Sequence, residues 1–424
     1  MEQPYSLADE DVRATFTPIC IIGAGPAGAT TALQLNRLGV PCTIIDKAIF
    51  PRDKVCGDGL SGKVITALER IDPDIAKRFR TFAGKQESWG VDFVSPGRYT
   101  MHIPYKNDYK PSQDLPVGFV CKRRDFDNFL IDEIKQAAHT TLLEGINIEH
   151  YIRQPDGFIV SDATGEVKIK CSLLIIANGA QSSFAKKHTH VTKDAAYSAG
   201  VRGYYSHVKG MHEHHFIELH FLRDLLPGYL WIFPLPDGDA NVGLDMLSND
   251  ISRKKINLRK LLNEKLTTDP ILKHRFSEAV LKSKIEGYVL PLAGNQPKIS
   301  GDNYLVVGDA AFMIDPLTGE GIGNAMCAGR IAATHAEKAL QQGDYSSVSL
   351  RAYDEDVYRI LGSEFNLSNR LQKLACYPSI FNWLMKRGSR SVKLQRLVSG
   401  MLYDIDLRKQ LASPRFYLKL FFSK

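Results

Sequence analysis

A glycine-rich turn near the N-terminus constrains the fold more than any other feature of the sequence. The β-branched run at residues 19–22 (ICII) leads into residues 23–28 (GAGPAG), and a helix-like segment follows at residues 29–38. A second apolar run at residues 43–45 ends at Asp46. Strand, glycine turn, helix, strand and acid in this order predict the first βαβ unit of a Rossmann-like domain that binds a dinucleotide.

Each glycine of the turn has a separate task in such a unit. Gly23 permits the tight turn, Gly25 lets the backbone approach a pyrophosphate, and Gly28 allows the helix to pack closely. Asp46 is placed to accept hydrogen bonds from a ribose diol, which argues against a 2′-phosphate at this position. Since the sequence holds no second intact GxGxxG, we expect one tightly bound dinucleotide and one flavin domain, not separate Rossmann domains for FAD and NADPH.

Later apolar runs extend the predicted parallel sheet. Residues 173–176 (LLII) precede the turn ANGA, and residues 304–307 (YLVV) precede the turn GDAA. Both are strand-like runs that end in turn residues, as strands of one buried parallel sheet do. The stretches at residues 89–103 and 199–244 are richer in aromatic residues, alternation and Gly/Pro turns, which predicts an inserted antiparallel sheet.

We therefore predict an α/β fold with an α+β insertion. A Rossmann-like cofactor domain is combined with an antiparallel sheet that carries the substrate pocket, and a helical C-terminal region lies over the mouth of that pocket. The predicted limits are residues 15–85, 115–185 and 285–345 for the discontinuous cofactor domain, 86–114 and 186–284 for the substrate-binding sheet domain, and 346–424 for the helical basic C-terminal region.

The segment at residues 304–330 carries a second glycine-rich turn. Asp309, at the end of an apolar run, is placed to bind a polyol hydroxyl. Residues 316–323 (PLTGEGIG) open a helix whose backbone N–H groups point outwards, and such a helix start stabilises negative charge. A flavin that has accepted a hydride carries negative charge near N1 and the C2 oxygen, so this turn predicts a site for the redox ring.

These motifs together resemble those of known flavoenzymes. GAGPAG followed by Asp46, the GDAA turn, and Pro316 with three glycines downstream are similar to the FAD-binding motifs of the para-hydroxybenzoate hydroxylase-like FAD superfamily. Residues 50–61 (FPRDKVCGDGLS) and 227–234 (PGYLWIFP) resemble the geranylgeranyl reductase family. The resemblance extends from about residue 18 to residue 332, and the tail matches no motif.

The resemblance implies FAD as the cofactor and a set of residues that contact it. Arg123 stands three residues before Phe126 in the Arg-x-x-Phe-Asp spacing of the superfamily. The superfamily's mid-chain Asp-Gly motif is altered to Asn178-Gly179, which weakens the case for direct use of NADPH and leaves NADPH, NADH or a reduced protein as the electron donor. The implied cofactor-binding residues are Gly23, Gly25, Ala27, Gly28, Asp46, Lys47, Arg52, Cys56, Gly57, Arg123, Asn178, Gly179, Gly308, Asp309, Pro316, Gly319, Gly321 and Ile322.

Cys56 is the cysteine with candidate chemistry. It lies in a loop with Arg52 and Lys54, where nearby cations favour a thiolate, and the resemblance places this loop near the flavin. The alternative is a cysteine tolerated because it is small. Cys56, Tyr229 and solvent are the candidate proton donors.

Three aromatic residues form the predicted substrate-binding face. Tyr229, Trp231 and Phe233 alternate in an expected strand, so their side chains share one side of it. The resemblance implies that this face lines an apolar substrate cavity, and the alternative is ordinary strand core. Flavin halogenases have a related motif with two tryptophans and Ile-Pro, and because Tyr229 and Phe233 replace the first Trp and the Ile, a halogenase is disfavoured.

The resemblance implies an FAD-dependent oxidoreductase that reduces carbon–carbon double bonds of an apolar, isoprenoid-like substrate by hydride transfer from reduced flavin. An FAD-dependent monooxygenase that hydroxylates or epoxidises an aromatic or lipid substrate is the alternative on the same fold. A flavin- and lipid-binding protein without turnover is an alternative of another class. The glycine turn at residues 316–323 argues against it, because a carrier needs no helix start directed at the redox ring.

Charge is concentrated in the C-terminal tail. Residues 371–424 carry eleven lysines and arginines against two acids, together with aromatic residues that include Phe381, Trp383 and Phe421. This mixture is typical of amphipathic helices that touch an anionic membrane or close over the rest of the protein, and a solvated helix face is the plain alternative. No nucleic-acid-binding module accompanies the charge.

The rest of the sequence indicates in which compartment the protein resides and whether it binds a metal. The sequence contains no apolar run long enough to span a bilayer and no signal peptide at its start, so we expect a cytoplasmic protein, with any contact at the inner face of the membrane being peripheral. Seven cysteines without a CxxC pair indicate neither disulfides nor zinc, and the histidines at 212–215 lack a metal-binding pattern, so no metal site is expected. The oligomeric state is left open.

Overall fold

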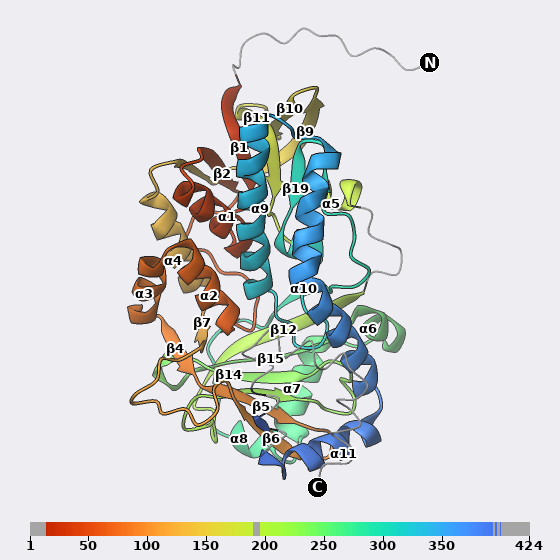
Figure 1. The fold of residues 1–424 in the computed structure, drawn as a ribbon. Coiled ribbons are helices and arrows are strands. Elements are labelled where there is room, and N and C mark those ends of the chain that lie inside the picture. The colour runs from red at the N-terminus through yellow and green to blue at the C-terminus, as the bar shows by residue number, and fades with distance from the viewer. Residues whose placement is uncertain (1–13, 190–195, 393–394, 397–398, 400–424) are drawn as a thin grey trace.

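A computed structural model describes residues 14–189, 196–392, 395–396 and 399, and every structural statement below concerns these residues. Figure 1 shows two halves: a sheet flanked by helices at the top, and a second sheet below it. A long C-terminal helix runs down the side of both halves and continues into a shorter helix at the bottom. The protein is therefore a mixed α/β molecule whose two sheets meet near its middle.

The upper sheet is built on five parallel strands in the order β19-β11-β1-β2-β8. Because β1 pairs with β2 on one side and with β11 on the other, strand order reverses there, and ligands bind in the crevice at such a switch point. The elements are β1 (Thr15–Ile22), β2 (Cys42–Asp46), β8 (Thr140–Glu144), β11 (Lys168–Ile176) and β19 (Tyr304–Val306), extended by antiparallel β9 (Ile148–Gln154), β10 (Gly157–Asp162) and β18 (Ser300–Gly301).

Two helices pack against each other on one face of this sheet (Figure 1). They are α1 (Pro26–Arg37) and α9 (Ile322–Gln342). Their axes come close because Gly329 has no side chain: a Cβ there would lie 2.4 Å from the carbonyl oxygen of Ala27. The strand residues beneath are fully buried, as expected for a parallel sheet covered on both faces.

The lower sheet has the order β16-β12-β15-β14-β13-β5-β6, with β17 also paired to β12. The inserted sheet is antiparallel as predicted, apart from the parallel pairing of β5 with β13. These two strands come from distant segments, so no hairpin turn fixes their relative direction. The strands are β5 (Gly90–Val94), β6 (Thr100–Pro104), β12 (Tyr197–Ser206), β13 (Ile217–His220), β14 (Leu230–Pro234), β15 (Ala240–Leu247), β16 (Val280–Leu281) and β17 (Glu286–Pro291).

Shorter elements complete the fold. A small sheet of β3 (Gly59–Leu60), β7 (Gly118–Cys121) and β4 (Lys85–Ser88) lies between the two halves with helices α2 to α4 beside it. The helices are α2 (Gly62–Ile71), α3 (Pro73–Thr81), α4 (Arg123–Lys135), α5 (Ser183–His188), α6 (Ser248–Lys254), α7 (Leu258–Thr268), α8 (Leu272–Arg275), α10 (Ser347–Ala375) and α11 (Pro378–Gly388), with short 3₁₀ turns η1 (Pro236–Gly238) and η2 (Gly308–Ala311).

The predicted C-terminal region is helical where the structure describes it. α10 and α11 account for most of residues 346–392, and among the described residues no helix combines the length and apolarity needed to cross a bilayer. The tail aromatics Phe416, Tyr417, Phe421 and Phe422 lie outside the described residues. The domain limits proposed from the sequence stay a prediction.

Candidate active site

The turn after β1 depends on two glycines that pack tightly against the sheet. Gly23 has φ +104°, and a Cβ there would lie 2.5 Å from the carbonyl oxygen of Ala177 at the end of β11. A Cβ on Gly28 would lie 1.9 Å from the carbonyl oxygen of Gly23. At Gly25 the nearest atom to the Cβ position is Nη2 of Arg52, 3.7 Å away. The backbone at Gly25, at the start of α1, is therefore open to a ligand.

Asp46 is held at the edge of the same turn. Its Oδ2 accepts a hydrogen bond from the backbone N–H of Ala24 at 2.7 Å, and its Oδ1 accepts one from Ala48 at 2.9 Å. A carboxylate has about four acceptor positions, so both oxygens retain capacity for ribose hydroxyls. The acid predicted from the sequence thus lies beside the glycine turn.

A cavity of about 430 Å³ lies between the two sheets. It brings together most of the residues implied by the motifs, from the glycine turn, the loop after β2, α4, β14 and the start of α9. Its lining includes Gly25, Ala27, Cys56, Gly57, Arg123, Gly179, Tyr229, Trp231, Phe233, Gly308, Asp309, Pro316, Gly319, Gly321 and Ile322. The predicted residues outside its lining are Gly23, Gly28, Asp46, Lys47, Arg52 and Asn178.

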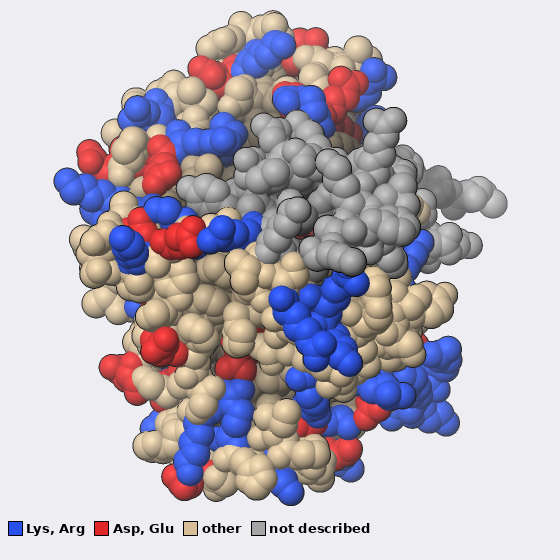
Figure 2. Space-filling model, turned by 60° about the horizontal axis from the view of Figure 1, so that its bottom comes forward, with Lys and Arg blue, Asp and Glu red and all other residues tan. Residues whose placement is uncertain are grey.

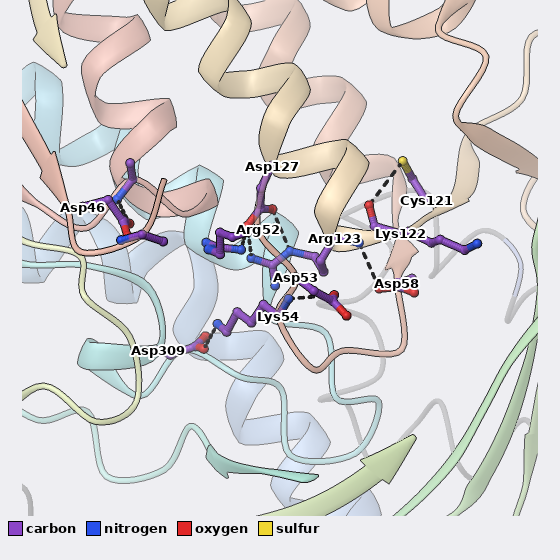
Figure 3. Close-up of polar contacts among 12 residues, drawn as sticks. Asp46, Arg52, Asp53, Lys54, Asp58, Cys121, Lys122, Arg123, Asp127 and Asp309 are labelled. Carbon is purple, nitrogen blue, oxygen red and sulfur yellow. Dashed lines mark hydrogen bonds and ion pairs between the residues drawn. The ribbon is translucent and has the colours of Figure 1, made fainter. Parts of the chain in front are cut away.

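Two arginines converge on one buried carboxylate at the start of α4 (Figure 3). Arg123 donates from Nε and Nη2 to Asp127, each at 2.7 Å, and Arg52 donates from Nη1 to the same carboxylate at 2.6 Å. Burial alone would raise the pKa of Asp127, but the charge and hydrogen bonds of Arg123 and the charge of Arg52 lower it below its ordinary value. Arg123 is only 3% exposed, so it is not a solvent-facing arginine, and it places positive charge at the cavity wall.

A second ion pair lies at the other side of the glycine turn. Lys54 Nζ is 2.9 Å from Oδ2 of Asp309, and both residues line the cavity. Figure 3 shows Lys54 reaching from the loop after β2 toward Asp309. Asp309, expected to bind a polyol hydroxyl, therefore already has a fixed cation beside it.

The thiolate expected at Cys56 is wrong. Burial raises the pKa of the Cys56 thiol, and the charges of Arg123 and Lys54 offset this effect only in part. The two cations near Cys56 in the sequence are engaged elsewhere, Arg52 with Asp127 and Lys54 with Asp309. Cys56 therefore presents a protonated thiol to the cavity.

The three aromatic residues of the predicted substrate face all line the cavity. Tyr229 donates its hydroxyl to the carbonyl oxygen of Thr318 at 2.6 Å, and burial raises the pKa of this phenol well above its ordinary value. Trp231 lies over Gly243 of β15, where a Cβ would be 2.3 Å from the indole ring. Phe233 packs on the loop that carries Gly57. The aromatic wall is thus fixed by its own contacts.

The turn before α9 and the start of that helix also line the cavity. Asp315 shapes the turn by accepting hydrogen bonds from the N–H groups of Leu317 and Thr318 at 3.0 and 2.9 Å. Gly319 has φ +70°, and a Cβ there would lie 2.8 Å from the Tyr229 hydroxyl. The helix start therefore lies directly beside the aromatic wall, and its backbone N–H at Gly323 donates to Oε1 of Glu320 at 2.7 Å.

One end of the cavity carries charged residues that were not predicted from the sequence. Lys63 Nζ on α2 is 2.8 Å from Oε2 of Glu364 on α10, and it also donates to Oδ1 of Asn324 at 2.6 Å. Asp315 and Glu320 line the same region, and burial raises the pKa of each. Asp315 and Glu320 stand within the motif at residues 304–330, but the pairing of Lys63 with Glu364 leaves no signal in the sequence.

No group of three His, Cys, Asp or Glu side chains is placed to hold a metal ion in the part of the chain that the structure describes. The cavity joins an open glycine backbone at a strand switch point to a helix start beside an aromatic wall, and Asp46 lies outside its lining, next to the glycine turn.

The sequence pattern of a family described as "FAD binding domain" matches residues 16–235, just over half of the chain. The chain belongs to this FAD-binding family. It is an FAD-dependent oxidoreductase, and the glycine turn and cavity described above are the candidate site for its cofactor. The open backbone at Gly25 and the carboxylate of Asp46 fit the pyrophosphate and the ribose of this cofactor.

Full-length relatives of the FAD-binding chain include reductases. It is 29% identical over 409 residues to a menaquinone reductase of Mycobacterium tuberculosis (strain ATCC 25618 / H37Rv), with 92% of each chain covered. It is 25% identical over 401 residues to a digeranylgeranylglycerophospholipid reductase of Methanosarcina acetivorans, with 91% of each chain covered.

Solved structures share the fold of this chain. A geranylgeranyl bacteriochlorophyll reductase-like protein from Thermoplasma acidophilum has a TM-score of 0.80 and 20% identity, covering 94% of this chain and 99% of its own. A halogenase in complex with FAD has a TM-score of 0.71 and 17% identity, covering 93% and 85%. At these identities the structures show the fold alone, which reductases and halogenases share.

Proposed function

We propose that this FAD-dependent oxidoreductase reduces carbon–carbon double bonds of a long apolar, isoprenoid-type substrate. The observation that carries the proposal is the single cavity that runs from the glycine turn at Gly25 to the aromatic wall of Tyr229, Trp231 and Phe233. An apolar chain bound on that wall lies beside the cofactor. The names of the full-length relatives, reductases of menaquinone and of a digeranylgeranyl lipid, support the same substrate class.

The chain's own residues position the reactants and exclude water. FAD, when bound, supplies the hydride, and the protein supplies placement and electrostatics. Apolar side chains such as Val91, Phe93 and Leu219 join the aromatic wall to hold the substrate chain. The start of α9 at Gly321 and the buried Arg123 provide positive potential at the cofactor end.

A proton must also reach the second carbon of the double bond. The Tyr229 proton is donated to the Thr318 carbonyl, whereas Cys56 offers a thiol that burial keeps protonated. Both side chains line the cavity, and both stay candidates for the proton donor.

Anaerobic reduction of the FAD enzyme, followed by mixing with menaquinone or a geranylgeranyl lipid, tests the proposal. Flavin reoxidation without oxygen is the expected result, with two hydrogen atoms gained on a carbon–carbon double bond of the isoprenoid chain; this gain persists after any quinol has been oxidised back to the quinone in air. Reoxidation only after oxygen is added, with gain of one oxygen atom, would instead indicate a monooxygenase. A flavin that stays reduced with every lipid would favour a non-catalytic binding protein. NADPH, NADH and a chemical reductant, compared in the reduction step, identify the electron donor.

We also propose that the protein meets its lipid substrate at an anionic membrane surface. α10 contributes Leu367, Leu371 and Gln372 to the cavity wall, and the chain continues directly into α11. On α11, Met385 packs inward against β6, whereas Ile380 and Trp383 are 45% and 40% exposed. The same end carries exposed basic residues, and Figure 2 shows lysine and arginine side chains on this face among uncharged surface. Exposed apolar and basic groups together favour peripheral binding to anionic lipid.

Vesicle sedimentation tests the membrane contact. The protein should sediment with vesicles of anionic lipid at low salt, less at high salt, and little with neutral vesicles. Ile380→Ser should reduce binding to anionic vesicles, whereas the matched change Ile152→Ser should not, because Ile152 is 53% exposed on β9 in the upper half of the molecule. Equal effects of both changes, or no binding at low salt, would leave α10 and α11 as an intramolecular cover only.

A further inference from the structure

The loop at residues 56–60 lies between the cofactor end and the aromatic wall of the cavity. A Cβ on Gly57 would lie 3.1 Å from the Phe233 ring, and one on Gly59 would lie 3.0 Å from it. Side chains at these two positions would therefore press against the Phe233 ring of β14. Asp58, between the two glycines, is fully buried and has φ +67°.

The Asp58 carboxylate joins elements from both halves of the molecule. Oδ2 accepts hydrogen bonds from the Tyr204 hydroxyl on β12 at 2.9 Å and from Nδ2 of Asn241 on β15 at 2.8 Å. Oδ1 accepts one from the backbone N–H of Arg123, the first residue of α4, at 3.2 Å (Figure 3). The backbone carbonyl of Asp58 accepts one from Cys121 on β7 at 2.9 Å. One residue thus holds four elements together.

Asn241 carries these contacts into the cavity wall. Its Nδ2 also donates to the backbone carbonyl of Cys56 at 2.8 Å, and its Oδ1 accepts from Nε1 of Trp231 at 2.9 Å. Asn241 is fully buried, so its amide orientation is set by these partners. A continuous set of hydrogen bonds therefore runs from Asp58 to the Cys56 backbone and to the Trp231 indole.

We propose that Asp58 is a positioning residue: through Asn241 it fixes Cys56 and Trp231 relative to each other, so that the cofactor loop and the substrate wall keep one geometry. The inference rests on the proposed function of the cavity. Glycine would adopt the backbone conformation of residue 58 without strain, whereas aspartate is strained there. The contacts of the carboxylate to three elements explain why this position holds a strained aspartate and not a glycine.

The electrostatic setting makes this arrangement sensitive to pH. Burial raises the pKa of Asp58 to about 6, although hydrogen bonds from Asn241 and Tyr204 and the charge of Arg202 lower it in part. When Asp58 takes up a proton, the carboxyl loses acceptor capacity, and the Asn241 amide is held less firmly. The charged and titratable groups facing Asp58 are Arg202 and Tyr204 from β12, Arg123 from α4, Cys121 from β7, and Cys56 from its own loop.

The indole N–H resonance of Trp231 in FAD-loaded, ¹⁵N-tryptophan-labelled protein reports this arrangement directly. Trp231→Phe assigns the resonance. In the unchanged protein it should shift with a midpoint near pH 6, the pKa of Asp58. Asp58→Asn should abolish the titration and displace the resonance at every pH. The matched change Asp53→Asn, in the same loop but on a half-exposed side chain bonded to Arg202, should leave the titration in place.

A second variant keeps the test decisive if Asp58→Asn does not fold. Tyr204→Phe removes a donor that stabilises the carboxylate, so the midpoint of the Trp231 titration should move to higher pH. A resonance that does not titrate near pH 6 in the unchanged protein, or that titrates identically in Tyr204→Phe, would overturn the proposal. The resonance needs no turnover, so an enzyme that fails to reduce isoprenoids but shows these shifts would refute the proposed function and leave the positioning role standing.

Discussion

The glycine turn after β1 and the aromatic wall on β14 border the same cavity but depend on different parts of the chain. At the turn, backbone atoms approach so closely that Gly23 and Gly28 have no room for a side chain. At the wall, side chains make the contacts, as Tyr229 does with Thr318 and Trp231 with Asn241. Gly23 and Gly28 are therefore inseparable from the fold, whereas changes at the wall should affect substrate and cofactor separately.

Gly28→Val should have the largest effect. Its Cβ would lie 1.9 Å from the Gly23 carbonyl oxygen, so the turn must shift, with a loss of stability above about 3 kcal/mol and loss of FAD. Gly25→Ala is the matched control, because its Cβ meets only the end of the Arg52 side chain, at 3.7 Å. It should keep the melting temperature of the apoprotein while weakening FAD binding. Full FAD content in purified Gly28→Val would contradict this account of the turn.

Asp127→Asn should have the second largest effect. It leaves the buried Arg123 without its counter-charge, and breaking such a pair costs about 3–5 kcal/mol. Because the pKa of Asp127 lies below its ordinary value of 3.8, the stability it contributes is present above that pH and is lost as the pH falls further. Urea unfolding at pH 7 and below pH 4 should therefore show a difference between the two proteins that shrinks in acid. A constant difference would argue against the ion pair as its source.

Trp231→Ala tests the wall. Turnover of an isoprenoid substrate should fall about tenfold or more, equivalent to about 1.4 kcal/mol in the transition state, while FAD content stays unchanged. Purified variants can be compared by kcat/KM and by flavin absorbance. Parallel loss of FAD, activity and melting temperature would mean that Trp231 serves only as core.

Asp309→Ala should have the smallest effect, a loss of about tenfold in FAD affinity in a folded protein. The side chain contacts Lys54 at 2.9 Å, so the variant also leaves that lysine unpaired. Lys54→Ala separates the two causes, because it removes the ion pair and keeps the carboxylate. If both variants weaken FAD equally, the ion pair and not a contact from Asp309 to the cofactor accounts for the loss.

Local patterns in the sequence were enough to predict the cofactor end. The expected strand, glycine turn and helix match β1 and α1, because that unit is specified by residues that are neighbours along the chain. The side-chain pairs were not predictable in the same way. The thiolate at Cys56 was wrong because burial raises the pKa of the thiol more than the nearby cations lower it, and Arg52 and Lys54 pair with Asp127 and Asp309, which lie 75 and 255 residues away.

The same limit explains the features that sequence analysis missed. Lys63 meets Glu364 across 301 residues, and Asn241 meets Asp58 across 183. The parallel pairing of β5 with β13 likewise joins strands from separate segments, with no turn to indicate their direction. Asp58 stands inside the motif FPRDKVCGDGLS, but its burial and its partners appear only in three dimensions.

The most direct test of the central claim is the reoxidation of reduced enzyme by an isoprenoid lipid in the absence of oxygen. Stopped-flow absorbance of the flavin should show reoxidation that depends on lipid concentration, with mass spectrometry detecting two added hydrogen atoms per flavin. Trp231→Ala, with its full FAD content, should reoxidise more slowly by about tenfold or more. Reduced flavin that persists with the lipid but reoxidises once oxygen is admitted, with oxygen incorporated into the lipid, would contradict the assignment as a double-bond reductase.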